Sequence, residues 1–290
     1  MVLDDLLANL FDYAGLFPPA GLGMDAAVRN FAAYRRSGHA AWLGRFIVPA
    51  ARLREFEASA AAVSPEGWRL SALGGADLSA DLAEIARFNA AHATETLCID
   101  AIEFRADTID EIHAKLALAP ASLTPYVEIP IQEDPAALIG TLAERGARAK
   151  VRTGGVTPAA FPPSLNLARF IAQCSDEDVP FKATAGLHHP VRGVHRLTDA
   201  PDSESAMMHG FLNLLLTAAF AQNGLGIEQL AEVLEERAPD AFGFDQGSIT
   251  WRGEMAVRAH IRNMRSLLVV SFGSCSFTEP IEDLKTMGLL

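Results

Sequence analysis

The sequence is short of cysteine, and the few cysteines it has are far apart. Only Cys98, Cys174 and Cys275 occur, and no two of them form a CxxC pair. An odd, dispersed set is unlike the disulfide framework of a small secreted domain or the paired ligands of a structural zinc site. We therefore expect a protein of a reducing, cytoplasmic environment.

Long apolar runs and an excess of positive charge are absent as well. The longest apolar stretch, 211–221, is too short to cross a bilayer, and the first ten residues carry two aspartates where a signal peptide needs basic residues. The formal net charge of −12 provides no field that would attract nucleic acid or an anionic membrane surface. We expect neither as a partner, although local basic positions can still bind a small anion.

What the sequence does contain is a regular alternation of strand-like and helix-like segments. Half of the 290 residues are apolar, which suits one large α/β domain. The strand-like segments lie at 43–50, 68–75, 96–105, 124–131, 148–155, 179–186 and 267–274. With a short strand near the N-terminus, this pattern predicts an α/β fold of the (β/α)8 TIM type over residues 1–290, with its chemistry at the carboxyl ends of the strands.

The alternation breaks between residues 187 and 265. This stretch holds a polar loop, two helical segments at 205–222 and 226–237, and a hairpin pattern that turns at Gln246-Gly247. We interpret 187–265 as an insertion before the last strand that serves as a lid or an oligomer contact, and we expect a homo-oligomer.

Lysine is scarce in a chain that otherwise uses arginine. Four of the 24 basic residues are lysine, and two of these, Lys150 and Lys182, lie inside apolar strand patterns. An amine, unlike a guanidinium, can lose its proton and attack a carbonyl, and a second cation nearby lowers its pKa. We interpret the two lysines as catalytic, because buried lysines are uncommon. The alternative is two structural lysines, each paired with a strand carboxylate.

Charged residues on neighbouring strands extend this candidate site. Arg152 lies two residues after Lys150 and so points to the same face, where an anion is needed between them. Glu128 from the preceding strand, or a substrate phosphate or carboxylate, would serve. Asp100 and Glu103, three apart in one strand, should point to opposite faces, so that only one lines the interior as a proton relay or a counter-ion.

Loops after the last two predicted strands provide further candidates. His188 and His189 diverge in an extended chain, so a shared metal is not required, and we expect neither a metal nor another cofactor. The FGSCS loop at 272–276 can offer backbone N–H groups to a phosphate, especially if a helix begins at 278–280. The predicted substrate-binding residues are Glu128, Arg152, Thr153, Thr184, His188, His189, Gly273, Ser274 and Ser276.

Seven segments, in this order, resemble deoxyribose-phosphate aldolase, a class I aldolase on a (β/α)8 barrel. They are FDYAGLFPPAGLGMDAAV (11–28), RFIVPAAR (45–52), ETLCIDAIEFRA (95–106), YVEI (126–129), AKVRTGG (149–155), FKATAGL (181–187) and SFGSCS (271–276). The resemblance implies that Lys150 forms a Schiff base and that Lys182 lowers its pKa. It also implies Asp100 as the proton relay, or Glu103, since the Asp100 match needs a one-residue gap.

The chain departs from the family pattern beside both lysines. Arg152 replaces a small hydroxyl residue, and 187–189 (Leu-His-His) replaces a second glycine and a basic residue that help to hold phosphate. The paired lysines are shared with the family, whereas the groups beside them differ. We expect a Schiff-base aldolase or lyase that acts on a small anionic carbonyl compound, such as a sugar phosphate.

Three other functions remain open from the sequence alone. Lys150, Arg152 and Lys182 could form an electrostatic clamp for a phosphate or carboxylate without covalent catalysis. The chain could be a non-catalytic sensor or assembly subunit that uses the apolar helix at 206–222 as its contact. A metal hydrolase would be built on His188, His189 and Glu128.

Overall fold

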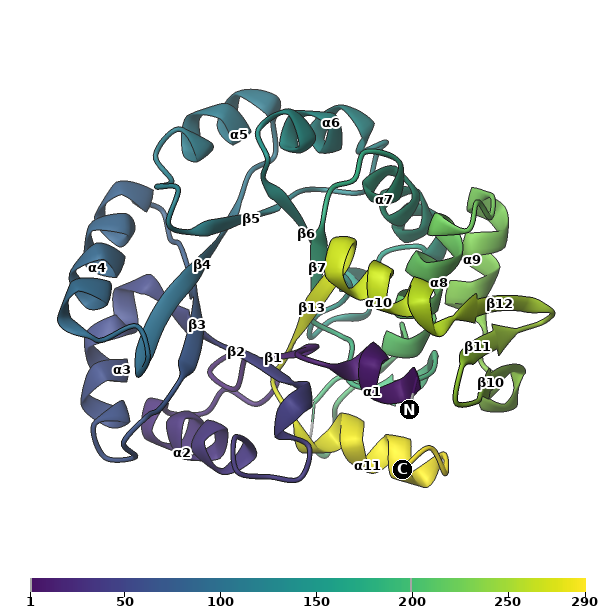
Figure 1. The fold of residues 1–290 in the computed structure, drawn as a ribbon, viewed down its shortest axis with the longest axis horizontal. Coiled ribbons are helices and arrows are strands. Elements are labelled where there is room, and N and C mark those ends of the chain that lie inside the picture. Colours follow the sequence, from purple (N-terminus) through teal and green to yellow (C-terminus); the bar gives the residue numbers. More distant parts are fainter. Residues whose placement is uncertain (1, 199) are drawn as a thin grey trace.

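Eight parallel strands close into a barrel in the computed structural model, which describes residues 2–198 and 200–290. The barrel strands are β1 (Phe11–Tyr13), β2 (Leu43–Pro49), β3 (Trp68–Leu73), β4 (Leu97–Arg105), β5 (Thr124–Glu128), β6 (Arg148–Arg152), β7 (Phe181–Thr184) and β13 (Val269–Ser274). They are paired in the order β1-β13-β7-β6-β5-β4-β3-β2, and Figure 1 looks into the ring that they form. The predicted (β/α)8 barrel of the TIM type is confirmed.

Helices form an outer layer around the strands (Figure 1). They are α1 (Val2–Leu7), α2 (Met24–Tyr34), α3 (Leu53–Ala60), α4 (Leu78–Ala91), α5 (Ile109–Leu116), α6 (Ala136–Glu144), α7 (Ser164–Asp176), α8 (Phe211–Gln222), α9 (Ile227–Glu235), α10 (Arg258–Leu267) and α11 (Thr278–Thr286). Local sequence sets some of the starts. Asp77 and Thr108 cap α4 and α5 by accepting hydrogen bonds from the backbone N–H of Ala80 and Glu111.

The hydrophobic core lies between the strands and the helices, whereas the inside of the barrel is polar. In β6, Ala149 and Val151 are fully buried in the apolar core, and the alternating residues Arg148, Lys150 and Arg152 point inward. Residues paired across a parallel ladder share a face, and Lys150 pairs with Glu128 on one side and Lys182 on the other. Strand register therefore places charged side chains at the same height, where TIM barrels usually have branched apolar ones.

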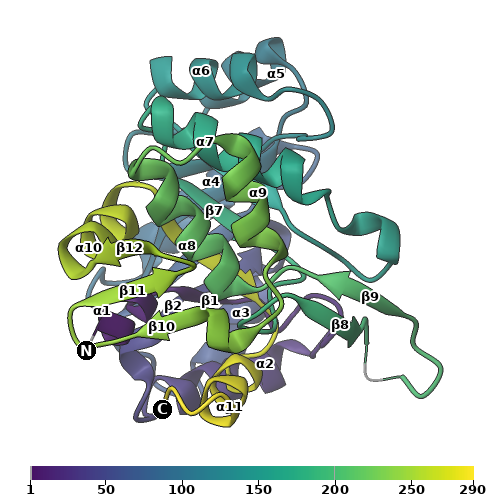
Figure 2. The same cartoon turned by 90° about the vertical axis from the view of Figure 1, so that its right-hand side faces the viewer.

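The stretch 187–265 is only partly an addition to the barrel. It contains the hairpin β8 (Gly193–Arg196)–β9 (Ser205–Met208) and an antiparallel sheet of β10 (Phe242–Phe244), β11 (Ser248–Trp251) and β12 (Glu254–Val257). In Figure 2 the β8–β9 hairpin projects on the right, and the β10–β12 sheet lies on the opposite side, near the N-terminus. The predicted hairpin at Gln246-Gly247 is confirmed as the β10–β11 turn.

Helix α8, by contrast, belongs to the barrel's own helical layer. Every residue from Phe211 to Phe220 is buried, and the Phe211 ring packs on Phe11 and Phe272 at centroid distances of 5.7 and 5.6 Å. The expectation that the apolar helix at 206–222 serves as a contact for another subunit was therefore wrong: its apolar surface is covered within the chain. Among the described residues, no helix is long and apolar enough to cross a membrane.

If α8 belongs to the barrel's helical layer, truncating the buried phenylalanine at its start should destabilise the whole fold. Phe211→Ala removes a fully buried ring, and we expect it to lower the free energy of unfolding by about 3–5 kcal/mol. Urea denaturation followed by circular dichroism measures the loss. Val194→Ala is the control, since this valine on the β8–β9 hairpin is 59% exposed and its loss should cost less than about 0.5 kcal/mol. Equal effects of the two changes would contradict the placement of α8.

Candidate active site

The centre of the barrel holds a row of ionised side chains whose charges alternate. In order, the row contains Asp12, Lys182, Glu103, Lys150, Glu128 and Arg152. Glu103 is the central member. Its Oε1 lies 2.7 Å from the amine of Lys182, and its Oε2 lies 3.0 Å from the amine of Lys150. One carboxylate therefore joins the two lysines that the sequence singled out.

Each amine has a second carboxylate partner. Lys182 Nζ lies 2.6 Å from Oδ2 of Asp12, and Lys150 Nζ lies 2.9 Å from Oε2 of Glu128. The other oxygen of Glu128 accepts a hydrogen bond from Nε of Arg152 at 3.1 Å. The predicted Glu128–Arg152 pairing is thus present, and it ends the row at the partly exposed Arg152.

Hydroxyl and backbone donors complete the coordination of the two most deeply buried carboxylates. Ser71 donates to Oε1 of Glu103 at 2.6 Å, and Ser271 donates to Oδ2 of Asp12 at 2.7 Å. The backbone N–H of Arg45 donates to Oδ1 of Asp12 at 2.7 Å. Buried charges are stable only when they are paired and hydrogen-bonded, and these contacts meet that condition.

Burial and pairing act in opposite directions on the pKa values of this row. Burial alone would raise the pKa of Glu103, but Lys182, Lys150 and the Ser71 hydroxyl hold it far below its usual range. Burial alone would lower the pKa of Lys182, but the carboxylates of Asp12 and Glu103 outweigh it and raise the pKa. Both groups are therefore ionised in the folded protein at neutral pH.

A cavity of about 320 Å³ opens above this row, at the carboxyl ends of the strands. Its lining includes Glu103, Lys150 and Arg152. The side chain of Lys150 is 5% exposed and forms part of the wall, whereas that of Lys182 is 1% exposed and lies outside the lining. A ligand in the cavity therefore meets the Lys150 amine directly, and Lys182 acts on it only through Glu103.

Asp100 belongs to a different cluster from the lysines. Its carboxylate accepts two hydrogen bonds from Arg45, at 2.7 and 2.9 Å, and lies 3.3 Å from Nε of Arg69. The β3–β4 register shifts between the Leu70–Ile99 and Ser71–Ala101 pairs, which is a bulge at Asp100. Of the two acidic candidates on this strand, Glu103 and not Asp100 meets the lysines.

The loop after β13, where the sequence predicted a phosphate cradle, borders a separate cavity lined by Ser276, His188 and Arg196 among others. Helix α11 does begin at Thr278, as expected, but Ser276 Oγ already accepts the N–H of Glu279, and Pro280 has no N–H to donate. The Glu279 carboxylate lies 3.2 Å from Nδ1 of His188. The hydroxyl of Ser274 donates to the backbone oxygen of Ser276 at 2.6 Å. Of the loop's predicted binders, Gly273 alone lines the cavity above the row of charges.

Two further predicted binders turn away from the cavity. Thr153 is fully buried, and its hydroxyl donates to the backbone oxygen of Ala185 at 2.6 Å. His189 pairs with Asp283 at 2.6 Å and stacks on His195 with ring centroids 3.4 Å apart. Neither residue lines the cavity above the row of charges, and His189 lines a separate cavity together with His188 and Ser276.

His188 and Thr184 do line the cavity. Burial would lower the pKa of His188, but its contacts with Cys275 and Glu279 outweigh burial and raise it to about 10. The imidazole is therefore a cation on the cavity wall at neutral pH. Its ring lies 6.4 Å from that of His189, which pairs with Asp283 at 2.6 Å and also lies 3.9 Å from the Glu279 carboxylate that His188 contacts. Across residues 2–198 and 200–290, no three His, Cys, Asp or Glu side chains gather to hold a metal.

Sequence reasoning missed Asp12, Ser71 and Ser271. Asp12 could have been found, because it is a lone acidic residue in the apolar segment at 11–17. The two serines carry no such signal, since single serines in strands are common and only the barrel's closure brings these two to the carboxylates.

Removing the buried amine of Lys182 tests how strongly the stability of the charged row depends on it. Lys182→Met leaves the buried Glu103 with one cation fewer, and we expect it to lower the free energy of unfolding at pH 7 by about 3–5 kcal/mol. Native Glu103 has a depressed pKa, so its pairing stabilises the fold above about pH 4.5 and that contribution is lost only below it. Burial without Lys182 raises the pKa of Glu103, and the variant then gains stability relative to the native protein as the pH falls from 7 to 5.

Urea unfolding at pH 7 and pH 5 measures this difference. Lys115→Met, at an exposed lysine near Glu111, is the control and should change the unfolding free energy by no more than about 0.5 kcal/mol. A Lys182→Met penalty that is equal at the two pH values would contradict the electrostatic account.

Comparison with known proteins identified no relative of this chain. Neither a protein-family model, nor a curated protein, nor a solved structure matches the chain. The arrangement of its own side chains therefore carries the functional conclusion.

Proposed function

We propose that the chain is a lysine-dependent carbonyl enzyme of the aldolase or lyase class, in which Lys150 forms a Schiff base with a small anionic carbonyl compound. The observation that carries this proposal is the position of the Lys150 amine. It forms part of the wall of a cavity at the carboxyl end of the barrel, and the carboxylates of Glu103 and Glu128 lie 3.0 and 2.9 Å from it.

The two carboxylates are placed for the proton transfers of imine formation. The Lys150 ammonium first gives a proton to Glu103 or Glu128, which makes the amine nucleophilic. This transfer is uphill, because neighbouring cations hold the pKa of both carboxyl groups below its usual range. The nitrogen then attacks the carbonyl carbon. A C–N bond forms, the carbonyl oxygen leaves as water with two protons that came from the nitrogen, and no proton is gained or lost overall. The product is an iminium ion.

The same carboxylates stabilise the iminium and its onward reaction. The iminium carries its positive charge where the ammonium carried it, so the contacts to Glu103 and Glu128 persist. When the bond between the α- and β-carbons breaks, a base takes the proton of the β-hydroxyl group, the β-carbon leaves as a second carbonyl compound, and the electron pair moves toward the nitrogen to give an enamine. Removing a proton from the α-carbon gives an enamine in the same way. Lys182 is a positioning residue here: together with Ser71 it holds Glu103 in place without reaching the cavity.

Sequence and cavity support the same class of substrate. Lys150 lies in the segment AKVRTGG, which resembles the Schiff-base motif of deoxyribose-phosphate aldolase. The cavity of about 320 Å³ suits a small molecule, and Arg152 and His188 place positive charge on its wall. A small carbonyl compound with an anionic group fits these features. Schiff-base chemistry of this kind requires no external cofactor.

One observation favours a second function without covalent chemistry. Each lysine amine already contacts two carboxylates, as the lysines of a structural ion-pair network do. In that case Lys150 and Arg152 would hold an anionic ligand electrostatically, as in an isomerase or a transferase.

Reductive trapping separates the two functions. We expect borohydride, added with small aldehydes, ketones and sugar phosphates, to fix an adduct on Lys150, because its amine alone of the central pair reaches the cavity. Intact mass and peptide mapping locate the adduct. The Lys150→Leu variant should lose the adduct and all turnover while remaining folded, and Lys115→Leu should lose neither. No adduct on Lys150 across a broad panel would leave the electrostatic function as the better account.

A matched pair of carboxamide variants tests the proton relay. Glu103→Gln keeps the shape of the side chain but cannot accept a proton, and we expect kcat to fall about 100- to 10,000-fold. Asp100→Asn, three residues earlier on the same strand, should change kcat much less, because Asp100 pairs with Arg45 and Arg69. Steady-state kinetics on folded variants, checked by circular dichroism, make the comparison. A larger loss in Asp100→Asn than in Glu103→Gln would overturn the assignment.

A further inference from the structure

We infer that a second cavity, beside the end of β5, binds the anionic group of the substrate between Arg105 and Arg152. This inference names where the charged end of the substrate lies, and for the chemistry at the other end it rests on the proposed function. The site differs from the β13 loop that the sequence had suggested for the same purpose.

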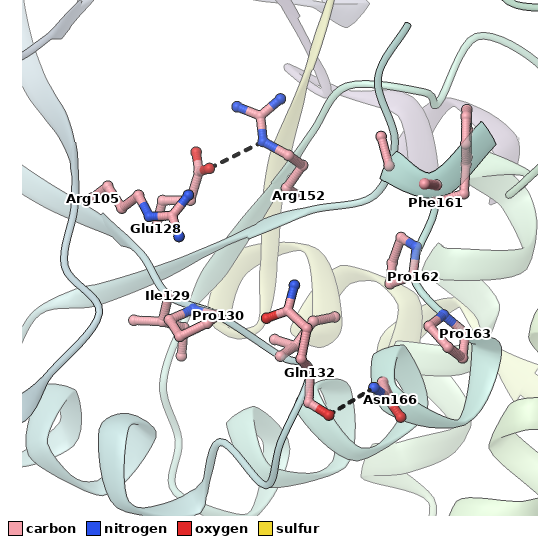
Figure 3. A pocket seen from close by; sticks show the side chains of 13 residues that line it. Arg105, Glu128, Ile129, Pro130, Gln132, Arg152, Phe161, Pro162, Pro163 and Asn166 are labelled. Carbon is pink, nitrogen blue, oxygen red and sulfur yellow. Dashed lines mark hydrogen bonds and ion pairs between the residues drawn. The ribbon is translucent and has the colours of Figure 1, made fainter. Parts of the chain in front are cut away.

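The cavity lies against the carboxyl ends of three neighbouring strands. It has a volume of about 170 Å³ and is closed on one side by residues 159–163, which lead into α7. Arg105, Glu128 and Arg152 are the last residues of β4, β5 and β6, and all three line it. Figure 3 shows Glu128 between the two arginines, facing Arg152 across the marked hydrogen bond. Two guanidinium groups thus flank a single carboxylate.

Both guanidinium groups keep donors for a ligand. Among the contacts that the described residues make, Arg152 bonds Glu128 through Nε, and Figure 3 shows its two terminal nitrogens directed away from Glu128. Arg105 likewise uses Nε, on Asp107 at 2.7 Å. The side chains are 65% and 53% exposed for Arg105 and Arg152, so the terminal N–H groups of each are accessible. Such paired, planar donors match the oxygens of a carboxylate or a phosphate.

The second cavity shares one lining side chain with the first and contacts its Lys150 wall through another. Arg152 lines both cavities, and Glu128 lines the second while its Oε2 contacts the Lys150 amine at 2.9 Å. An oxyanion held by the arginines therefore directs the rest of a short molecule toward Lys150.

The size of the second cavity limits what it can hold. A water molecule takes about 30 Å³ of liquid volume, so about 170 Å³ admits one group of several non-hydrogen atoms. A terminal carboxylate or phosphate meets that limit. The substrate class is thus a short carbonyl compound with an oxyanion at the end remote from the reacting carbon.

Chemical protection of the arginines tests the binding site without any need for turnover. The native protein is labelled with phenylglyoxal in the absence and presence of inorganic phosphate or of acetate, and the labelled peptides are mapped. We expect either anion to slow labelling of Arg105 and Arg152 at least about threefold and to leave Arg145 unaffected. Arg145 is an exposed residue just after α6, before β6 begins, and serves as the matched control. The anion that protects at the lower concentration identifies the group. No protection by either anion overturns the inference.

The Arg105→Gln variant tests whether an anion bound at the arginines positions the carbonyl carbon at Lys150. Imine trapping is compared for glyceraldehyde 3-phosphate and the uncharged glyceraldehyde. We expect the concentration for half-maximal labelling of Lys150 to rise at least about tenfold for the phosphate and to stay within about twofold for the uncharged aldehyde. An equal change for the two compounds, or none for either, overturns the inference. If anions protect both arginines but no compound ever labels Lys150, the Schiff-base function fails and the binding site stands.

Discussion

The sharing of one buried carboxylate, Glu103, between two buried amines is the constraint on which the rest of the site depends. An isolated charge in a protein interior costs several kcal/mol, and removing one partner of a buried pair leaves the other uncompensated. Glu103 avoids this cost because each oxygen has its own ammonium partner and Ser71 donates a further hydrogen bond. Asp12 and Glu128 extend the same alternation outward, so the row is satisfied as a unit.

Such a row requires strands held in one register, and the apolar layer outside the barrel provides that support. Aromatic residues such as Phe46, Phe56 and Phe211 pack between strands and helices, where they stabilise the fold without entering the site. A slip of one residue would turn the inward side chains of β6 toward the helices and bury uncompensated charge. Apolar packing and the charged interior therefore specify the same strand register. Any other register would cost free energy in both.

Site residues could be predicted from the sequence where the residue type was unusual for its strand. They could not be predicted where their position depends on a backbone bulge or on a contact with a distant side chain. Lys150 and Lys182 stood out because charged residues rarely lie in apolar strands. The choice between Asp100 and Glu103 could not be made by strand alternation, because a bulge at Asp100 breaks the alternation. The surroundings of the β13 loop could not be predicted, because the Glu279 carboxylate and the N–H capping by Ser276 depend on how α11 folds back on the barrel.

The sequence by itself determined the alternation of strands and helices, and with it the barrel, because apolar periodicity reflects which face of each element is buried. It also determined which two amines lie inside. Only the tertiary structure decided that Asp12, Ser71 and Ser271 join these amines, that α8 is covered by the barrel, and that Arg105 and Arg152 share one cavity. These facts depend on contacts between residues far apart in the chain, which form only when the barrel closes and brings its first strand beside its last.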